Sequence, residues 1–233
     1  MTLVPSQERA RYVRALFTRL APRYDLMNRL MTAGQDGLWR SEVIRRARLA
    51  PGARLLDLGT GTGDLAREAR RQQPDVRLAA ADFTLAMLQS GQGRHGALNW
   101  AAADARRLPF PDETFDAVVS GFLMRNVGPV QPVLAEKFRV LKPGGRIVIL
   151  DTTRPARHWL FPFIWAYLRL VIPLAGRLIT GIPDAYSYLG TSTENFLLAE
   201  DLAGQMEAAR FQAVGFRRRM FGTVAIHWGL RPP

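Results

Sequence analysis

A glycine-rich turn between an apolar strand and a helix constrains the fold of this chain more than any other feature. The segment ARLLDLGTGTGD, at residues 53–64, passes from a short apolar run into three alternating glycines. We predict a strand over Arg54–Leu58 and a helix that opens at the turn and ends near Gln72. Ligands of open α/β sheets bind at the carboxyl ends of strands, where glycine lets the backbone approach them closely. The turn therefore predicts a ligand-binding α/β sheet.

Further apolar runs predict strands that alternate with helices. The strands are expected at residues 76–82, 98–104, 115–122 and 146–151, and the helices near 84–91 and 132–141. The sequence KPGG at 142–145 ends the second helix, because proline and glycine force a turn. Five short strands alternating with helices indicate a parallel sheet with helices on both faces.

The flanking regions complete the predicted fold. Amphipathic helices are expected at 6–20 and 37–48, another helix at 199–209, and two antiparallel strands over 211–229 that turn near Gly222 at the sheet edge. We therefore predict a doubly wound, mostly parallel, seven-stranded α/β sheet of Rossmann-like type. The 233 residues suffice for one domain. Its expected parts are an N-terminal helical cap (1–49), a core (50–151), an apolar helical insertion acting as a lid (152–198), and a C-terminal helix and hairpin (199–233).

Composition excludes some kinds of chemistry. The chain has no Cys, which rules out disulfides and thiolate metal sites. Its three histidines, His95, His158 and His227, lack metal-ligand spacing, so no metal is expected. The net charge is +12, and thirty of the 32 basic residues are Arg. This balance indicates either an anionic partner or the arginine usage of a GC-rich genome. No RNA-binding signature accompanies it, so no nucleic acid partner is predicted.

One apolar segment suggests contact with a membrane. Trp159–Ile179 is interrupted by prolines and arginines, and its longest charge-free run is too short to span a bilayer. It is expected to lie on an anionic membrane surface, to wall an apolar pocket, or to pack in the interior. The N-terminus has no apolar signal segment. We expect a cytoplasmic protein with peripheral contact to the inner face of the membrane, and leave homodimer formation open.

The residues around the turn indicate which ligand it holds. Nucleotide-binding turns read G-x-G-x-x-G, so that a helix N-terminus receives a pyrophosphate. Counted from Gly59, the third position of that pattern is Asp64, whose carboxylate would repel phosphate. S-adenosylmethionine carries a sulfonium and an ammonium group instead of phosphate. Asp57 and Asp64 suit such a cation, so Asp57, Gly59 and Gly61 are predicted to contact S-adenosylmethionine.

Two more predicted strands also end in an aspartate. Asp82 lies nineteen residues beyond Gly63, where a carboxylate can accept both ribose hydroxyls; its alternative role is to cap the helix starting near Thr84. Asp104 can accept a hydrogen bond from the adenine amino group while the Ala105 N–H meets a ring nitrogen, or it is an ordinary loop aspartate. Three acidic strand ends in order after one glycine-rich turn form a joint signal for an adenosine ligand.

The pattern over residues 50–151 resembles the class I S-adenosylmethionine-dependent methyltransferases. A more specific resemblance, to the ubiquinone/menaquinone biosynthesis C-methyltransferase family, spans nearly the whole chain. It rests on the segments APRYDLMNRLMTAG (21–34), DLGTGTGDLA (57–66), LPFPDETFDAVVSGFLMRNV (108–127), RVLKPGGRIVILD (139–151), AYSYLGTST (185–193) and GTVAIHWG (222–229). The YDLMN and RNV segments are its most specific parts.

The resemblance implies both a reaction and a set of contacts. The cofactor contacts fall on Thr62, Asp82 and Asp104–Ala105; where the family has a further serine contact, this chain has Gly121, with Ser120 beside it. The implied reaction is C-methylation of a polyprenylated quinol precursor, with demethylmenaquinol to menaquinol favoured over a ubiquinone precursor. A methyltransferase for another small lipophilic acceptor is the first alternative, and an RNA methyltransferase the second.

Ring methylation needs a group that stabilises a phenolate, because a ring carbon is a weak nucleophile until the adjacent phenol loses its proton. Arg125 is the leading candidate: it follows the fourth predicted strand, and its guanidinium could stabilise the phenolate or order a water. Its alternative role is an ion pair with a surface carboxylate. Tyr24 is expected to close over the ring together with Asn28, or simply to pack. His227 is a candidate general base, with a structural role as the alternative. The expected acceptor contacts are Asn126, Tyr186 and Tyr188, with ordinary core packing as the alternative for the two tyrosines.

Overall fold

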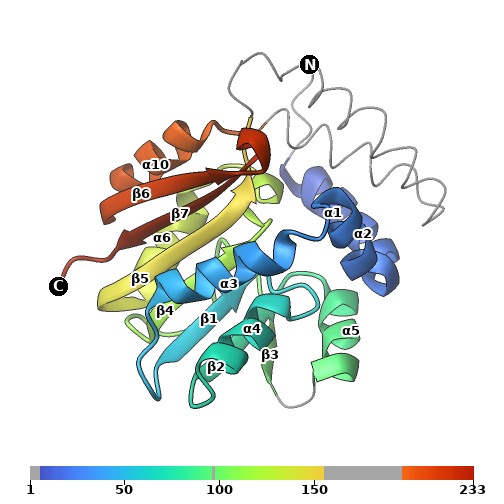
Figure 1. Ribbon diagram of the computed structural model, residues 1–233, viewed down its shortest axis with the longest axis horizontal. Helices are drawn as coiled ribbons and strands as arrows, with labels where there is room; N and C mark the ends of the chain where they lie inside the picture. Colours follow the sequence, from blue (N-terminus) through green and yellow to red (C-terminus); the bar gives the residue numbers. More distant parts are fainter. Residues whose placement is uncertain (1–5, 96–97, 155–195) are drawn as a thin grey trace.

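Helices lie on both sides of a seven-stranded sheet (Figure 1). This computed structural model describes residues 6–95, 98–154 and 196–233. The strand order is β3-β2-β1-β4-β5-β7-β6. The strands are β1 Arg54–Leu58, β2 Arg77–Asp82, β3 Asn99–Ala102, β4 Phe115–Gly121, β5 Leu141–Thr152, β6 Gln212–Arg219 and β7 Val224–Leu230. Neighbours among β1 to β5 are parallel, and β7 is antiparallel to both β5 and β6. The predicted doubly wound, mostly parallel fold is confirmed.

The topology places a ligand site where the strand order reverses. From β1 the chain runs outward through β2 and β3, then returns to the other side of β1 with β4. Helices that follow β1 and β4 therefore leave the sheet in opposite directions, and a crevice opens between their starts. The glycine-rich turn after β1 lies at that crevice, as the sequence predicted.

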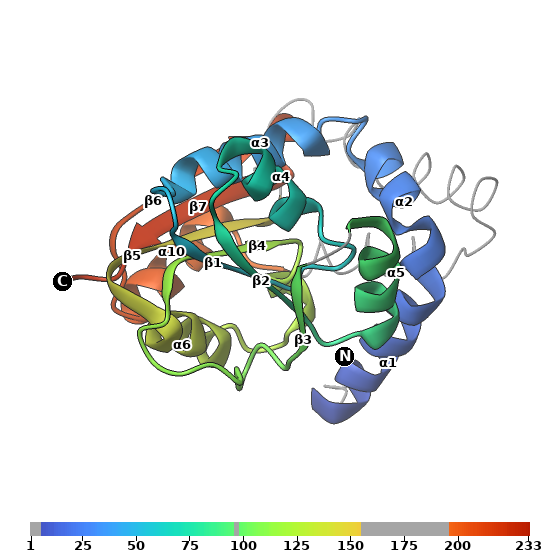
Figure 2. The same cartoon turned by 90° about the horizontal axis from the view of Figure 1, so that it is seen from below.

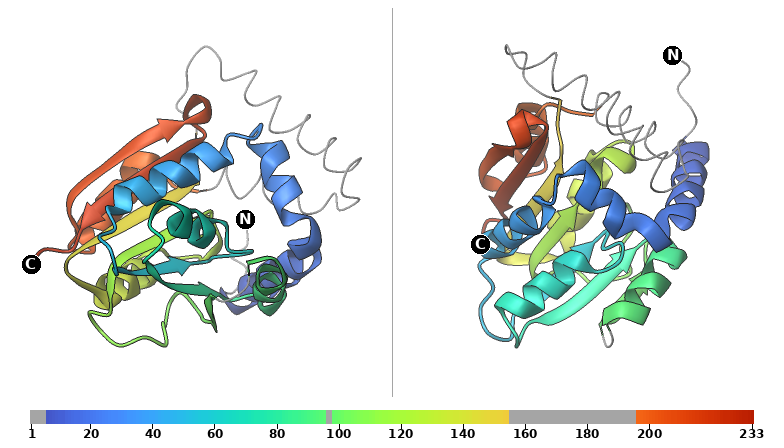
Figure 3. Two further views of the ribbon diagram at one scale, coloured as in Figure 1. Left: turned by 60° about the horizontal axis from the view of Figure 1, so that its bottom comes forward. Right: turned by 45° about the vertical axis from the view of Figure 1, so that its right-hand side comes forward.

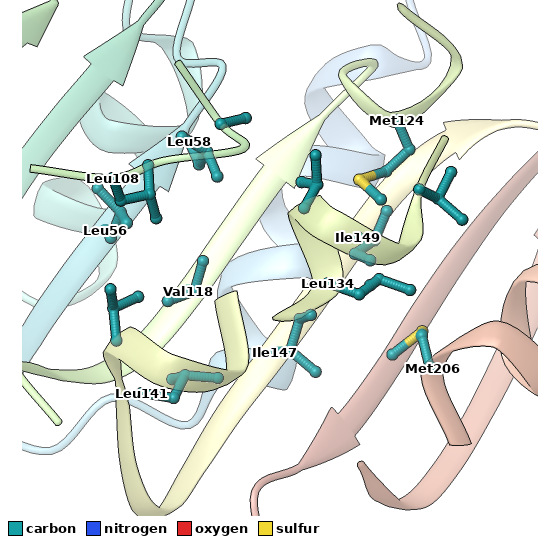
Figure 4. Packing of buried hydrophobic residues seen from close by; sticks show 14 of the residues in the cluster. Leu56, Leu58, Leu108, Val118, Met124, Leu134, Leu141, Ile147, Ile149 and Met206 are labelled. Carbon is teal, nitrogen blue, oxygen red and sulfur yellow. The ribbon is translucent and has the colours of Figure 1, made fainter. Parts of the chain in front are cut away.

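Alternating strand residues supply two apolar layers. On one face Leu56, Val118 and Ile147 pack with residues of α6 (Gln131–Val140) and α10 (Ala199–Ala208) (Figure 4). On the other face Leu55 and Val148 pack with residues of α3 (Asp36–Ala47) and α4 (Asp64–Gln72). Figure 2 shows α3 and α4 above the sheet and α6 and α10 below it. Two-sided burial explains why these strands read as apolar runs in the sequence.

The remaining described helices gather beyond the carboxyl ends of the strands. They are α1 (Ser6–Leu20), α2 (Tyr24–Met31) and α5 (Leu85–His95), and the 3-10 turn η1 (Ala21–Arg23) joins the first two. Two further 3-10 turns lie elsewhere, η2 (Met124–Asn126) after β4 and η4 (Met220–Gly222) between β6 and β7. Figure 3 shows α1 and α5 side by side at this end of the molecule, and the two helices are in contact. This arrangement roofs the crevice.

Two elements differ from the sequence prediction. The segment expected to link the first two helices contains α2, because Met27 and Asn28 bury one side of it while Leu26 stays exposed. Strand β5 begins at Leu141 rather than 146, because Leu141 pairs with Phe115 before a register shift brings Arg146 opposite Ala117. The KPGG sequence is thus an irregularity within a strand pairing, not a separate turn before it.

The lid predicted over 152–198 falls largely outside the described residues. Trp159–Ile179, Tyr186 and Tyr188 are among the residues not described. Within the described part of the chain, no helix combines the length and the apolarity needed to cross a bilayer.

Candidate active site

A cavity opens at the carboxyl ends of β1, β2 and β4. The empty space in and around it, including open solvent at its mouth, amounts to about 940 Å³. The floor comes from the turn after β1 and from strand ends, and the roof from α1 and α2. The sequence-predicted residues on its wall are Tyr24, Gly59, Gly61, Asp82, Asp104, Ala105, Gly121 and Asn126; apolar neighbours on the wall include Phe17, Met87 and Leu123. Its mixture of apolar walls with a few polar groups is typical of small-molecule sites.

The glycine-rich turn needs glycine for conformation and for space. Gly59 and Gly61 have φ angles of +70° and +57°, which side chains rarely tolerate. A Cβ on Gly59 would lie 2.8 Å from Cδ1 of Leu123. The N–H of Gly59 donates to the Ala81 carbonyl at 2.8 Å, which ties the turn to the end of β2. The backbone of the turn is therefore fixed on the wall of the cavity, with no side chain covering it at Gly59 or Gly61.

Asp82 takes the capping role that the sequence offered as an alternative, and it also lines the cavity. Its Oδ1 accepts the Thr84 N–H at 2.8 Å, ahead of α5, and its Oδ2 accepts the Gly61 N–H at 2.9 Å. Each carboxylate oxygen can accept a second hydrogen bond, and Asp82 lines the cavity. Burial raises the pKa of Asp82, against the lowering effect of these backbone donors. The carboxylate is held rigidly with acceptor capacity left over.

Asp104 lies on the same wall in a more open setting. The guanidinium of Arg106 pairs with it, with 2.7 Å between Nη2 and Oδ2, and this partner lowers the pKa of Asp104. Arg106 also lines the cavity, which the sequence analysis did not foresee, although its position two residues after a predicted contact was a usable signal. Ala105 presents its backbone beside this ion pair.

Asp57 lies beneath the turn rather than on the wall of the main cavity. Its side chain is fully buried, and its Oδ2 accepts the Thr60 hydroxyl at 2.6 Å and the Ala66 N–H at 3.1 Å. Burial raises the pKa of Asp57 to about 7. Its Oδ1 has no hydrogen-bond partner within the described residues, and Asp57 lines a smaller adjoining pocket.

Asp64 and Thr62 line the smaller pocket, and both have partners that the sequence did not predict. Asp64 is not an uncompensated anion there: its Oδ2 lies 2.9 Å from Nη2 of Arg40, and its Oδ1 lies 3.0 Å from Nη2 of Arg67. The Thr62 hydroxyl donates to Oδ1 of Asp25 at 2.8 Å. Arg40 and Asp25 were missed because these partners are distant in the sequence. Tyr24, Gly59 and Gly121 line both pockets, so the smaller pocket lies directly beside the main cavity.

Arg125 is paired with a buried acid. Its Nη1 lies 2.8 Å from Oδ1 of Asp151, the last acid of β5, and both side chains are buried. Oδ2 of Asp151 accepts the Met124 N–H at 2.7 Å and so holds η2 in place. The next residue, Asn126, lines the cavity, whereas Arg125 is not among the described residues that line it. The predicted alternative of an Arg paired with a surface carboxylate is thus replaced by a buried pair.

Burial and nearby charges both affect the pKa of Tyr24. Burial raises the pKa of Tyr24, while a hydrogen bond with Asn28 and the positive charges of Arg125 and Arg40 oppose that rise. The Phe17 ring meets it edge-on, with 6.0 Å between the ring centroids. Tyr24 therefore stays a neutral phenol near the Arg125–Asp151 pair.

Comparison with known proteins identifies the family. The sequence profile of the ubiE/COQ5 methyltransferase family matches residues 4–231. The chain belongs to that family. It is 45% identical to the ubiquinone/menaquinone biosynthesis C-methyltransferase UbiE of Desulfotalea psychrophila, over 94% of this chain and 90% of that protein. It is 37% identical to the demethylmenaquinone methyltransferase of a Roseiflexus species, over 98% of this chain and 97% of that protein.

Solved structures agree on the fold. A SAM-dependent methyltransferase from Aquifex aeolicus superimposes with a TM-score of 0.61 at 17% identity, covering 89% of this chain and 97% of that one. At this identity the likeness concerns the fold alone, and it supports the class I methyltransferase architecture that the sequence predicted.

Two residues predicted for this methyltransferase lie away from the cavity. The Ser120 hydroxyl accepts a hydrogen bond from Nζ of Lys137 at 2.6 Å, in the interior, so only the neighbouring Gly121 reaches the wall. His227 is buried on β7, with its Nε2 2.9 Å from the Ala199 carbonyl oxygen, and burial lowers its pKa. Neither residue lines the described cavity, because each side chain projects from the sheet towards a packed helix. The structure thus places both side chains apart from the other predicted site residues.

Within the described ranges, no three His, Cys, Asp or Glu side chains gather in a position to hold a metal ion.

Proposed function

We propose that this protein transfers a methyl group from S-adenosylmethionine to a ring carbon of a polyprenylated quinol precursor, with demethylmenaquinol favoured as the acceptor. The observation that carries the proposal is the cavity at the switch point of the sheet, which joins rigid carboxylates to an apolar wall. The names of the family and of its relatives support the reaction and the acceptor class.

The donor set of the cavity fits an adenosyl group. Asp82 retains acceptor capacity for two ribose hydroxyls, and Asp104 with the Ala105 backbone suits an adenine edge. Among the described residues that line the cavity, the one basic group is Arg106, and it is paired with Asp104, so these residues form no basic cluster that could receive a pyrophosphate. S-adenosylmethionine would supply an electrophilic methyl group here.

The smaller pocket suits the amino acid end of the same molecule. Arg40 offers a guanidinium to a carboxylate, although Asp36 and Asp64 now share it. Asp57 offers its unpartnered Oδ1 to an ammonium group. A positive charge at that oxygen would favour the ionised carboxylate and so offset the rise in its pKa. Thr62 and Gly61 complete this end.

The acceptor ring would lie between the roof and the end of β4. Tyr24 and Asn126 face that space, and Phe17 and Leu123 provide its apolar surface. The Arg125–Asp151 pair beneath holds η2, and the positive charge of Arg125 would favour loss of the acceptor's phenolic proton. We also propose that residues 152–198 cover the acceptor and that Tyr186 and Tyr188 contact it.

Exposed apolar side chains near the mouth support peripheral contact with a membrane. Phe83 lines the cavity and is 41% exposed, Leu85 is 48% exposed, and Tyr12 on the adjoining α1 is 50% exposed. The guanidinium of Arg14 lies 5.4 Å from the Phe83 ring centroid, so a cation accompanies the apolar rim. Such a rim would let a polyprenyl acceptor enter from an anionic bilayer.

Incubation with methyl-labelled S-adenosylmethionine and each reduced quinone precursor tests the proposal. We expect the label on a ring carbon of demethylmenaquinol and little transfer to the oxidised quinone, whose ring is electron-poor. Tyr24→Phe separates a hydrogen-bonding role from packing, since it keeps the ring but removes the hydroxyl. Label on another lipophilic acceptor or on RNA, with none on any quinol, would overturn the assignment of the substrate.

A further inference from the structure

A second groove, separate from the cavity, lies between the C-terminal half of α3 and the strands β5, β7 and β6. Figure 1 shows α3 crossing in front of the sheet, and this helix contacts β4, β5 and β7. Six arginines line this arginine groove: Arg45, Arg46, Arg48, Arg146, Arg217 and Arg219. The groove and the main cavity share no lining residue. The methyl-transfer proposal therefore leaves these side chains without a role.

One acid, Glu42, pairs with two of these arginines, and the groove stays positively charged. Glu42 binds Arg46 through Oε1, at 3.0 Å from Nε, and binds Arg219 through Oε2. Burial opposes ionisation of Glu42, but the hydrogen bonds from Arg219 and Arg46 outweigh it and lower its pKa. Because Glu42 is the one acid among the lining residues, six guanidinium groups face one carboxylate. A large positive charge is left over.

Four of the six arginines have no carboxylate partner. Among the described residues, no carboxylate forms an ion pair with Arg45, Arg48, Arg146 or Arg217. Burial and then the nearby charge of Arg48 lower the pKa of Arg146. Arg48 itself ends α3 in a left-handed conformation, with φ of 48°, which turns the chain towards β1. Like charges placed together in this way are unfavourable unless an anion joins them.

The geometry favours an extended phosphate anion over a nucleobase. Guanidinium groups bind phosphoryl oxygens in pairs, and here they come from a helix, from its C-terminal turn and from two strands, so a single phosphoryl group would not span them. Trp228 is the aromatic residue of the groove, and the Arg46 guanidinium already lies 3.5 Å from its ring centroid. That face of the indole is therefore not open for base stacking.

We propose that the arginine groove binds a linear anion of two or three phosphoryl groups, recognised through its phosphate oxygens. Bidentate contacts from Arg146 and Arg217 to such an anion would relieve the repulsion among the unpaired arginines. The site does not depend on the proposed methyl transfer, since neither its residues nor its chemistry is shared with the cavity.

Calorimetric titration of the full chain with inorganic tripolyphosphate, at about 0.15 M salt, where exposed charges are screened beyond about 8 Å, tests the proposal. We expect saturable binding of one anion per chain and a rise in melting temperature with anion concentration. The paired variant Arg146→Gln with Arg217→Gln should weaken binding at least tenfold. The matched control, Arg19→Gln with Arg77→Gln, removes the same charge from exposed positions outside the groove and should change affinity less than twofold.

Titrations with other phosphate compounds distinguish the possible sources of the anion. Adenosine triphosphate should bind with an affinity similar to tripolyphosphate, because the base is not recognised, and orthophosphate should bind more weakly. Equal losses in the groove and control variants would reveal general charge attraction and overturn the proposal. Tighter binding of a short RNA, or of vesicles rich in phosphatidic acid, that the groove variant abolishes would overturn it in favour of that partner. Arg48→Gln alone gives a second test should the paired variant unfold.

Discussion

The carboxylates facing the cavity and those sealed beneath it differ in environment although they follow the same sequence rule. Asp57, Asp82, Asp104 and Asp151 all lie at or just beyond strand ends, yet Asp104 is partly exposed and paired with Arg106, whereas Asp57 and Asp151 are fully buried. The partner of Asp104 lowers its pKa, and burial raises that of Asp57 to about 7. The aspartates at strand ends therefore fall into two groups: one faces the cavity, and the other is buried beneath it and stabilises the structure there.

A lysine belongs to the interior group. Lys137 is fully buried on α6 and donates to Ser120, and burial lowers its pKa to about 7, against the nearby charges of Asp151 and Asp57. The interior therefore contains groups that change protonation near neutral pH, while the Arg106-paired carboxylate in the cavity stays ionised.

The largest expected effect is on the buried pair. Asp151→Ala should lower the free energy of unfolding by roughly 3–5 kcal/mol, because it strands the buried charge of Arg125 and removes the acceptor that holds η2. Urea unfolding measures the change. The double variant Arg125→Met with Asp151→Leu should recover much of that loss, since it leaves no unpaired charge. A loss below 1 kcal/mol in the single variant would contradict the division into two groups.

Lys137→Met should increase stability in a pH-dependent way. The pKa of Lys137 in the folded chain is about 7 against an ordinary 10.5, so the cost of burying the ammonium is fully present below pH 7. That cost disappears as the pH rises from 7 towards 10.5, because the folded protein then loses its proton first. We expect a gain of about 1–4 kcal/mol below pH 7 that shrinks above it. Unfolding curves across pH 5–10 measure the gain.

The other lysine of the chain is the matched control for that experiment. Lys142 is 40% exposed and pairs with Asp116. Lys142→Met should change stability by about 1 kcal/mol or less, without the same pH dependence. Parallel pH curves for the two variants would show that burial of Lys137 does not control its charge.

Asp82→Ala should reduce S-adenosylmethionine affinity by roughly 10–100-fold, equivalent to about 1.5–3 kcal/mol of hydrogen bonds to a charged group. The reason is that both carboxylate oxygens are held in place by backbone donors and face the cavity. Calorimetric titration measures the affinity. Asp112→Ala, at a carboxylate that is 72% exposed on its side chain and outside the cavity, is the control and should bind normally.

The smallest effect is expected at Asp104. Asp104→Asn should cost about 0–1 kcal/mol of stability, because its pair with Arg106 is partly exposed. S-adenosylmethionine binding should weaken less than tenfold, since the amide oxygen can still accept a hydrogen bond. Thermal unfolding and calorimetry on the same sample test both parts. A loss of stability as large as that of Asp151→Ala would remove the contrast between the two groups.

Local patterns were enough to predict much of the fold. Strand β1 spans Arg54–Leu58 as predicted, because an apolar run that ends in a glycine-rich turn has few alternatives. The hairpin of β6 and β7 also forms near Gly222 as expected. Helix α2 was missed, since its amphipathic pattern covers only two turns and depends on burial of Met27 against other elements.

The site was predictable in its carboxylates and not in its ion pairs. Asp82 and Asp104 could be found because they recur at strand ends, a position that the local sequence marks. The bonds of Arg125 to Asp151, Lys137 to Ser120 and Thr62 to Asp25 join residues 26, 17 and 37 positions apart. Such partners meet through packing of the sheet against its helices, for which no local pattern exists.

By itself the sequence determined the order of the strands, the glycine turn and the acids that could meet an adenosyl group. The tertiary structure alone decided which of those acids face the cavity, which are buried, and which cation each one meets. The physical reason is that the charge state of a side chain depends on its access to water and on its neighbours, and both are set by residues far away along the chain.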